Sequence, residues 1–558
     1  MSPLASRKER PWWRDAVTYQ IYPRSYADSN GDGIGDVEGI RSRLPYLKSL
    51  GIDAIWISPW YPSPQHDHGY DVSDYMDIEP DYGTLAQAEQ LIKEANEVGI
   101  KLIVDIVPNH TSSDHKWFQA ALKAAPGSPE RNRYIFREGK GPNGDMPPNN
   151  WEAVFGGCAW ERVIEADGKP GQWYLHLFVV EQPDLNWENP EVVAHLEDVL
   201  KFWLDRGVAG FRIDVAHGMF KEKGLPDIRK DPAASMLGTE HKPFWDQEGV
   251  HGIYRAWRTI LDSYPGDRMA VAEAWVSPSE RIARYVRSDE LQNSFNFEML
   301  TTLWDAKQIK TKINNSIDAL EEVGAPTSWV FNNHDVVRSV DRLDLGLTNH
   351  GDTTLSRQGD PKKLNIARGT LRARSAALMT LALPGGTYLY QGEELAVPEV
   401  RDIPEDRLTD PRWKMSGFSD RGRDGCRVPM PWTSNPAGAF GFSTNASLKP
   451  EQAWLPQSPW WGTYAVDTQD GVEGSTLSMY RKALAIRKGE EGLGDGPMEW
   501  IEAGKDVVAF ERPGDFACYI NFGAPIELPS NSQVLVSSGP ITGHTLPTDT
   551  AAWVRLVS

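Results

Sequence analysis

The sequence predicts an α/β protein, a (β/α)8 TIM barrel with an inserted loop-rich domain after the third strand and a C-terminal antiparallel β domain. Eight short, apolar, β-rich runs alternate with helical patterns along the larger, N-terminal part of the chain. Two irregular stretches interrupt this alternation, and the last part of the chain returns to short β-rich runs. At 558 residues the chain is also too long for one compact core. We therefore expect a barrel from residues 1–110 and 182–465, an inserted domain at 111–181 and a C-terminal domain at 466–558.

The eight candidate strands are four to six residues long and rich in Val, Ile, Tyr and Trp, which favour a pleated, buried surface. They are Val17–Ile21, Asp53–Ser58, Leu102–Val107, Gly210–Val215, Met269–Glu273, Ser294–Phe297, Trp329–Asn332 and Thr387–Tyr390.

The helices between these strands have recognisable ends. Thr84 and Gln87 form a capping box at the start of one helix, and Gly99 marks its end. Asn189 caps a second helix, with Pro190 in its first turn. In such a barrel the loops after the C-terminal ends of the strands carry the active site, so residues at those positions are the first functional candidates.

The two interruptions lie after the third and the eighth strand. The first, from Thr111 to Glu181, contains GPNGDMPPNNW and is far longer than a usual connection of about 2–6 residues. The second runs from Glu394 to about residue 465, and long loops on this face of a barrel shape access to a site. Beyond it, a helix containing Met479–Arg487 precedes the β-rich runs of the C-terminal domain. These are Val507–Glu511, Ala517–Asn521, Gln533–Ser537 and Trp553–Val557.

Composition narrows the function classes. The formal net charge of −20 argues against nucleic acid and disfavours anionic substrates. The apolar runs fall short of the roughly 18 residues of a membrane span. The charged N-terminal segment MSPLASRKERPWW lacks the apolar stretch of a secretory signal, and three widely spaced cysteines do not suggest a disulfide framework. We therefore expect a cytoplasmic protein with small-molecule partners, and the 22 tryptophans include candidate platforms for sugar rings.

The stretch DSNGDGIGD, which begins at Asp28, has the oxygen-rich pattern that a hard cation needs. Asp28, Asn30, Asp32 and Gly33 match the start of an EF-hand loop. An EF-hand also requires a bidentate Glu at the twelfth position, where this chain has Gly39. The twelfth position therefore argues against a signalling-type EF-hand, and both a different calcium loop and a metal-free Gly/Asp turn stay open.

Carboxylates at the strand ends are the strongest chemical signal. Asp214 ends the fourth candidate strand, Glu273 ends the fifth, and Asp335 lies just beyond the seventh. Arg212 shares a face with Asp214, and its charge would keep that carboxylate ionised, as a nucleophile requires. Glu273 lies between two alanines, and an apolar setting favours a protonated acid. Two carboxyls with separated pKa values are what glycosidic bond cleavage requires.

Two histidines, His110 and His334, lie at the same rim of the barrel. For any single one of the three carboxylates, Asp214, Glu273 or Asp335, the alternative is an ordinary structural salt bridge. A metal site is a second alternative, but no pair of them has the close helical spacing of zinc ligands.

The chain resembles the α-amylase superfamily, glycoside hydrolase family 13, and within it the α-glucosidase and oligo-1,6-glucosidase group. The resemblance extends from Trp12 to Trp432. The matching segments are GIDAIWISPWYPSP, HGYDVSDY, DIVPNH, QPDLNW, GFRIDVAHG, VAEAW, NNHD and GGTYLYQGEEL, in the order of the family.

This resemblance implies a retaining α-glucosidase that acts on small α-glucosides. Asp214 would be the nucleophile, Glu273 the general acid/base, and Asp335 the residue that stabilises the transition state, with carboxyls about 5–5.5 Å apart. The other implied glucose-binding residues are Arg212, His110, His334, Asp71 and an arginine of RGRDGCR, which we take as Arg423, with Arg421 and Arg427 as alternatives. A structural Ca²⁺ would be bound by Asp28, Asn30, Asp32, Asp36 and the carbonyl of Ile34, remote from the chemistry.

The sequence leaves open which glucosidic linkage is cleaved and whether the reaction is hydrolysis or isomerisation. In similar enzymes a Val after the nucleophile accompanies α-1,6 cleavage, which makes Val215 a specificity candidate, although the following Ala216-His217-Gly218 departs from the usual pattern. Sucrose isomerases and trehalose synthases share the same triad, and SVDRLDLG contains only part of the isomerase RLDRD loop. An inactive sugar-binding or transporter-associated barrel is a further alternative, and the oligomeric state stays unknown.

Overall fold

The computed structural model describes residues 7, 9–229, 242–347 and 359–557. Eight parallel strands form its central barrel, in the hydrogen-bonded order β10-β11-β1-β2-β3-β7-β8-β9. A parallel bridge between Asn296 and Trp329 brings the two ends of this sheet together. The strands are β1 (Val17–Ile21), β2 (Ala54–Ile57), β3 (Lys101–Ile106), β7 (Gly210–Ile213), β8 (Met269–Ala272), β9 (Asn293–Ser294), β10 (Ser328–Val330) and β11 (Gly386–Tyr390). All eight predicted strands are confirmed.

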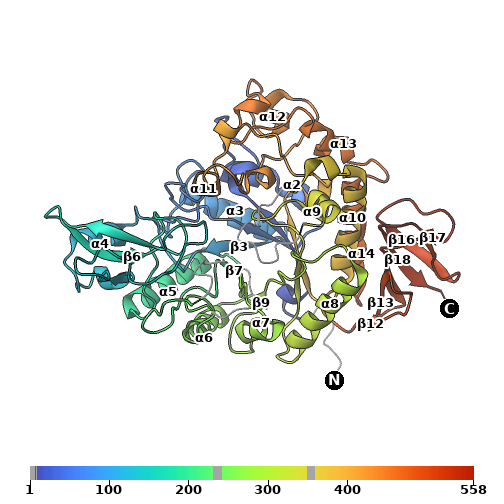
Figure 1. Ribbon diagram of the computed structural model, residues 1–558. Coiled ribbons are helices and arrows are strands. Elements are labelled where there is room, and N and C mark those ends of the chain that lie inside the picture. Colours follow the sequence, from blue (N-terminus) through green and yellow to red (C-terminus); the bar gives the residue numbers. More distant parts are fainter. Residues whose placement is uncertain (1–6, 8, 230–241, 348–358, 558) are drawn as a thin grey trace.

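Helices surround the barrel and bury their apolar faces against it (Figure 1). The predicted capping box of Thr84 and Gln87 starts α3, and Asn189 caps α5 through the backbone N–H of Glu191. The outer helices are α1 (Val37–Ser42), α2 (Leu44–Leu50), α3 (Leu85–Glu97), α5 (Pro190–Asp205), α6 (Gly249–Asp262), α7 (Ser279–Tyr285), α8 (Ala306–Glu321), α9 (Ser339–Leu345), α10 (Ile366–Ala382) and α14 (Thr476–Gly489).

The inserted segment projects to one side of the barrel (Figure 1). It carries α4 (Lys116–Lys123) and an antiparallel sheet in the order β4-β6-β5, formed by Phe136–Arg137, Pro170–Leu175 and Trp160–Ile164. Its apolar core includes Trp151, Trp160 and Leu177, and also Val215 from the end of β7. The insertion therefore packs directly on the barrel rim where the candidate nucleophile lies.

A five-stranded antiparallel sheet forms the C-terminal end of the chain, as predicted. Its order is β12-β13-β14-β18-β16, from Glu499–Trp500, Val507–Arg512, Phe516–Asn521, Thr550–Leu556 and Ser532–Ser537. A small pair, β15 (Ile526–Glu527) and β17 (Thr545–Leu546), lies beside it. The indole of Trp553 donates to the carbonyl of Leu378 in α10, which anchors this sheet on the barrel. Helix α14 contacts α2 and α10, so it packs with the barrel helices although it follows residue 466.

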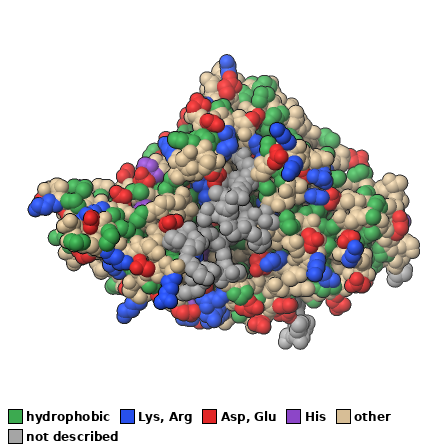
Figure 2. All heavy atoms as spheres, viewed as in Figure 1, with side chains coloured by type: hydrophobic (Ala, Val, Ile, Leu, Met, Phe, Trp, Pro, Cys, Tyr) green, Lys and Arg blue, Asp and Glu red, His purple; other side chains and the backbone are tan. Residues whose placement is uncertain are grey.

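Irregular chain after β11 covers part of the catalytic end. It contains the short helices α11 (Pro411–Met415), α12 (Ala437–Gly441) and α13 (Val466–Gln469). Figure 2 shows basic and acidic side chains interspersed on one face of the molecule, without one dominant basic patch. Within the described ranges no helix is both long and apolar enough to cross a lipid bilayer.

Candidate active site

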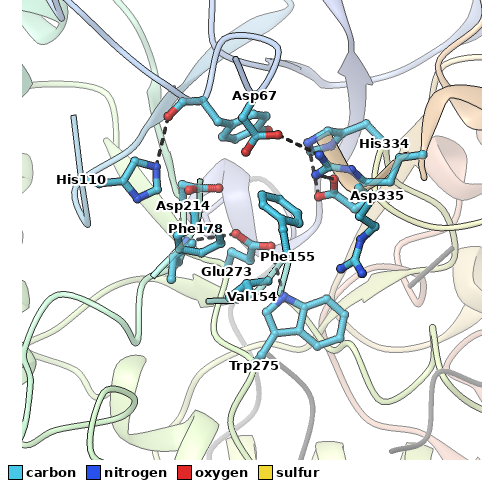
Figure 3. A pocket seen from close by; sticks show the side chains of 14 residues that line it. Asp67, His110, Val154, Phe155, Phe178, Asp214, Glu273, Trp275, His334 and Asp335 are labelled. Carbon is cyan, nitrogen blue, oxygen red and sulfur yellow. Dashed lines mark hydrogen bonds and ion pairs between the residues drawn. The ribbon is translucent and has the colours of Figure 1, made fainter. Parts of the chain in front are cut away.

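A cavity lies where the barrel strands end and the inserted segment and the post-β11 segment meet, with about 540 Å³ of empty space when the open solvent at its mouth is included (Figure 3). Its walls contain acidic, basic and aromatic side chains. The lining residues are Asp67, Tyr70, His110, Val154, Phe155, Phe178, Asp214, Val215, Glu273, Trp275, His334, Asp335, Arg412 and Arg423.

The three predicted carboxylates meet in this cavity. Asp214 directly follows β7 and Glu273 directly follows β8, and these strands pair in register at Ile213 and Ala272. The two carboxyls therefore leave the barrel side by side. Asp335 follows β10 and lies across the cavity from Asp214 (Figure 3). All three side chains are at most 15% exposed, so their charges interact with little screening by water.

Arg212 joins the candidate nucleophile and acid/base. Its Nη1 lies 2.6 Å from Asp214 Oδ1, and its Nη2 lies 2.7 Å from Glu273 Oε2. The same Nη1 lies 2.9 Å from Oδ1 of Asp105, a carboxylate on β3 that the sequence analysis did not single out. Arg212 is 1% exposed. One buried guanidinium is therefore shared by three carboxylates.

Burial, more than Arg212, determines the pKa of Asp214, which corrects the expectation from the sequence. Arg212 was expected to keep it ionised, but burial raises the pKa of Asp214 well above the usual range of an aspartate, and Arg212 only opposes that rise. The nearby charges of Glu273 and Asp105 raise the pKa of Asp214 further. Burial likewise raises the pKa of Asp105 to about 7. Asp214 and Asp105 therefore hold their protons more tightly than isolated aspartates would.

Glu273 is fixed by contacts on both of its oxygens. Trp275 Nε1 donates to Oε1 at 3.1 Å, and the backbone N–H of Val215 donates to Oε2 at 3.0 Å. The Trp275 ring stacks on Phe297, with centroids 3.9 Å apart. The sequence analysis missed Trp275, although its place two residues after an acid at a strand end was a usable signal.

Asp335 lies in a strongly cationic environment. Its Oδ1 is 3.0 Å from Arg423 Nη1 and 2.9 Å from Arg427 Nη2, and its Oδ2 is 3.3 Å from His334 Nε2. Burial alone would raise the pKa of Asp335, but His334 and the two arginines outweigh burial and lower it. Asp335 is therefore ionised throughout the neutral range.

Arg423 is the arginine of RGRDGCR that lines the cavity. Arg427 is fully buried behind it and contacts the same Asp335 oxygen. Arg421 points elsewhere, with its guanidinium bonded to the carbonyl of Ile403. Figure 3 shows Asp67 and Asp335 at the same end of the cavity, where each carboxylate pairs with Arg423.

The prediction that Asp71 closes this end is wrong. Asp71 is fully buried, and its carboxylate accepts hydrogen bonds from the Ser63 hydroxyl and from the backbone N–H groups of His66 and Asp67. Asp67 instead lines the cavity and pairs with Arg423 at 2.7 Å. Asp71 therefore shapes the loop from within, because its carboxylate satisfies the loop's own amides.

The two predicted histidines line the cavity as neutral imidazoles. Burial lowers the pKa of His110 to about 4 and the pKa of His334 well below its usual range. His334 stacks on Tyr70 with ring centroids 5.2 Å apart and an interplanar angle of 4°. His110 Nε2 lies 3.2 Å from the carbonyl of Tyr70 and 3.0 Å from the amide nitrogen of Gln182. A neutral imidazole offers one donor and one acceptor, which suits sugar hydroxyls.

Val215 lines the cavity in a left-handed backbone conformation, with φ of +42°. A β-branched residue pays a conformational cost there. This conformation directs the Val215 N–H to Glu273. The residue after the nucleophile therefore contributes its side chain to the cavity wall and its amide to the acid/base.

The DSNGDGIGD loop is drawn together by its own hydrogen bonds. Asp28 accepts from the backbone N–H groups of Gly31 and Gly33, and Asp36 accepts from Gly39 as the N-cap of α1. Asp32 accepts from Asn30 and from Ile34 N–H. Across residues 9–229, 242–347 and 359–557, no three acidic, His or Cys side chains converge as a metal site would require. The oxygen donors suit calcium, but their arrangement here is that of a self-bonded turn.

Comparison with known proteins agrees with this architecture. Residues 20–496 match the alpha amylase catalytic domain, and the chain therefore belongs to the alpha-amylase family, glycoside hydrolase family 13. A probable alpha-glucosidase of Rhizobium meliloti (strain 1021) is 36% identical over 553 residues, which covers 96% of this chain and 93% of the relative. An oligo-1,6-glucosidase of Parageobacillus thermoglucosidasius is 37% identical over 511 residues, covering 86% and 84%.

Two solved structures have the same fold over nearly the whole chain. An alpha-glucosyl transfer enzyme, XgtA, is 33% identical with a TM-score of 0.84, covering 98% of this chain and 100% of that one. An isomaltulose synthase mutant of Erwinia rhapontici NX5, in complex with sucrose, is 29% identical with a TM-score of 0.83, covering 99% and 100%. Hydrolysis, transfer and isomerisation thus all occur among the relatives of this glycoside hydrolase family enzyme.

Proposed function

We propose that the protein is a retaining, exo-acting α-glucosidase, which removes terminal non-reducing α-linked glucose from disaccharides and short oligosaccharides and also transfers glucose to sugar acceptors. The observation that carries this proposal is the Arg212 bridge between Asp214 and Glu273, in a cavity whose far end holds the Asp67–Arg423 ion pair. A cavity closed beyond the non-reducing end suits removal of a single glucose.

The mechanism follows from the two bridged carboxyls. Asp214 attacks the anomeric carbon and displaces the leaving sugar, while Glu273 protonates the glycosidic oxygen. Glu273 then removes a proton from water, which attacks the anomeric carbon and releases Asp214. The Arg212 bridge suits this chemistry, because it holds the Asp214 and Glu273 carboxyls side by side while Glu273 donates a proton in the first step and accepts one in the second.

The remaining lining residues would bind the glucose ring. Asp335 and Asp67 are acceptors for sugar hydroxyls, and Arg423 fixes both carboxylates through ion pairs of 3.0 and 2.7 Å. The neutral His110 and His334 add donors and acceptors. A carboxylate that stays ionised, as Asp335 does, can also stabilise the positive charge of an oxocarbenium-like transition state.

The α-1,6 and α-1,4 linkages are both within this proposal. Val215 favours isomaltose-type bonds by resemblance, and the relatives include an enzyme named oligo-1,6-glucosidase. The side chain of Val215 belongs to the cavity wall and also to the core of the inserted segment. It is therefore placed where a change of shape alters the path of the leaving sugar.

Sucrose isomerisation is less well supported than hydrolysis. The part of the chain that partly matches the isomerase loop forms α9, and its Arg342 is 1% exposed and bonded to backbone carbonyls of Leu300 and Phe331. Asp341 pairs with Arg401 at 2.8 Å. Neither residue lines the cavity.

An inactive sugar-binding or transporter-associated barrel is also less well supported. Such a barrel has no need of Asp214, Glu273 and Asp335 in one buried cluster with Arg212. Keeping these carboxylates away from water is costly even where Arg212 pairs with them, and a barrel without catalysis would gain nothing from that cost.

We further propose that Ca²⁺ binds the DSNGDGIGD loop and stabilises it without taking part in the chemistry. Asp28, Asn30, Asp32, Asp36 and the carbonyl of Ile34 would hold the ion through oxygen atoms. Each carboxylate that accepts a loop amide still has free lone pairs for a cation.

The test is the initial rate of glucose release from maltose, isomaltose, sucrose and trehalose at equal concentration, with polymeric starch as a fifth substrate. We expect rapid release from at least one disaccharide, the α-anomer as the first product by NMR, and slow release from starch. Asp214→Asn should reduce kcat by about 10⁴-fold while leaving the fold intact. A β-anomeric product, or rapid cleavage of starch, would contradict the proposal.

A further inference from the structure

Arg412 lines the cavity, but the residues that hold the glucose ring do not use it. It lies in α11, in the segment that follows β11, and is 5% exposed. Its guanidinium lies over the ring of Phe155, 5.4 Å from the centroid. Arg423 contacts the same ring at 5.2 Å. Arg412 is therefore about one aromatic ring away from the closed end of the cavity.

The position of Arg412 is fixed through its backbone. Asp410 caps α11 by accepting the N–H of Arg412 at 2.9 Å, and its other oxygen accepts the N–H and Nε of Arg423 at 2.8 and 2.6 Å. Gly422 permits this approach, because a Cβ there would lie 2.4 Å from the Asp410 carboxyl carbon. One carboxylate thus sets the spacing of both arginines.

The two guanidiniums differ in how far their donors are used. Each guanidinium nitrogen of Arg423 has a carboxylate partner: Nε contacts Asp410, Nη1 contacts Asp335 and Nη2 contacts Asp67. Within the described residues Arg412 has one ion pair, with Asp420 at 3.8 Å, which is too long for a hydrogen bond, and its buried Nε has no hydrogen-bond partner. A buried guanidinium with unused donors in a cavity wall is poised for a polar ligand group.

The direction of the cavity indicates which group that is. In the proposed function, Asp67, Asp335 and Arg423 bind the glucose hydroxyls at one end of the cavity. The leaving sugar must lie on the side of Glu273, which protonates its oxygen, and Trp275 marks that side through its bond to Glu273. Figure 3 shows Phe155 between Asp335 and Trp275. An arginine on Phe155 that is not engaged at the glucose end is therefore available to the sugar beyond the scissile bond.

We propose that Arg412 is a specificity-determining residue that donates hydrogen bonds to hydroxyls of the leaving sugar, and to the same hydroxyls of an acceptor sugar in transglucosylation. This inference rests on the proposed α-glucosidase function. In transfer, the acceptor hydroxyl attacks the anomeric carbon, the bond to Asp214 breaks, and Glu273 takes the hydroxyl proton. Arg412 binds the acceptor during this step without exchanging a proton.

The test uses 4-nitrophenyl α-glucoside, whose aglycone carries no hydroxyl, beside a disaccharide substrate. Arg412→Met should lower kcat/KM for the disaccharide by about 10- to 100-fold, the loss expected when a charged donor is removed. Hydrolysis of the nitrophenyl glucoside should change by less than about threefold. With that substrate as donor and glucose as acceptor, the ratio of transfer to hydrolysis should fall about 10-fold, because both products share one glycosyl-enzyme.

Arg421→Met is the matched control. Arg421 lies in the same segment, contacts the Trp413 ring at 6.0 Å and does not line the cavity. Its replacement should therefore leave unchanged both kcat/KM for the disaccharide and the ratio of transfer to hydrolysis. Arg412→Lys keeps the charge and should give intermediate losses. If Arg412→Met fails to fold and Arg412→Lys folds, an unchanged ratio of transfer to hydrolysis in Arg412→Lys overturns the inference.

An equal loss of kcat/KM on both substrates would assign Arg412 to glucose binding or to support of Phe155. No loss of kcat/KM on either substrate would leave Arg412 without a role. Either result overturns the inference. No activity of the unmodified enzyme on any α-glucoside would instead overturn the proposed function.

Discussion

Asp67 and Arg423 form an ion pair of 2.7 Å that joins two loops 356 residues apart in sequence. One loop follows β2 and the other follows β11, and these strands flank β1 in the barrel. Both residues line the cavity, and in the proposed function they close it at the end opposite the leaving sugar. Because Arg423 also holds Asp335, a change at Asp67 reaches a second carboxylate of the cavity wall.

The first prediction contrasts two aspartates of one loop. Asp67→Asn keeps the shape but loses the charge, and should lower kcat/KM for the preferred disaccharide by about 10- to 100-fold. Asp71→Asn should act on stability, because Asp71 accepts hydrogen bonds from the loop's own amides. We expect a drop of several degrees in Tm and a smaller loss of activity. A larger loss of kcat/KM in Asp71→Asn at unchanged Tm would contradict these assignments.

Much of the scaffold follows from local sequence patterns. The strands are short apolar runs between clear helix boundaries, so Val17–Ile21 is predicted with its bounds. The two-residue β9 overlaps its predicted range, Ser294–Phe297, only at Ser294. Asp214, Glu273 and Asp335 each follow the C-terminal end of a barrel strand. They meet in one cavity because all parallel strands of a barrel end at the same rim.

The details that sequence did not reveal depend on contacts between distant segments. Asp67 and Asp71 are four residues apart in one loop, and only the fold of that loop determines which carboxylate faces out. Asp105 becomes important because β3 lies beside β7, so that Asp105 shares Arg212 with Asp214 and Glu273. Arg412 gave no signal, since an arginine in a long irregular segment is most often exposed.

The second prediction concerns the pH profile. The charge of Asp105 helps to raise the pKa of Asp214, and Asp214 must be ionised to attack. Activity is therefore lost as pH falls through the pKa of Asp214. Asp105→Asn removes one negative charge from the cluster and lowers that pKa, so the acidic limb of kcat/KM should move to lower pH by about one unit.

The control is Asp289→Asn, the same change at an exposed carboxylate that pairs with Arg255 on the surface. Its pH profile should match that of the unmodified enzyme. A shift of the acidic limb to higher pH in Asp105→Asn would show that loss of the Arg212 contact outweighs the removed charge, contrary to the prediction.

The third prediction concerns linkage choice at Val215. Val215→Thr keeps the β-branched shape and the N–H to Glu273, but adds a hydroxyl to the cavity wall. We expect the ratio of kcat/KM for isomaltose to that for maltose to fall by about 10-fold, an effect of the size that small changes in a binding pocket produce. The strained backbone is common to both residues, so Tm should change little. An unchanged ratio would place linkage choice in the loop after Glu394.

The fourth prediction concerns the DSNGDGIGD loop. If Ca²⁺ binds there, incubation with a chelator should lower Tm by several degrees, and added Ca²⁺ should restore it, because a ligand that binds only the folded state stabilises that state. Asp32→Asn should weaken this response and leave kcat on a disaccharide nearly unchanged, since the loop contributes no residue to the cavity wall. Asp32 is the better choice for this test than Asp36, which also caps α1, so that its loss would destabilise the helix even without a metal. A Tm that is indifferent to chelator and Ca²⁺ would identify the loop as the self-bonded turn that its hydrogen bonds describe.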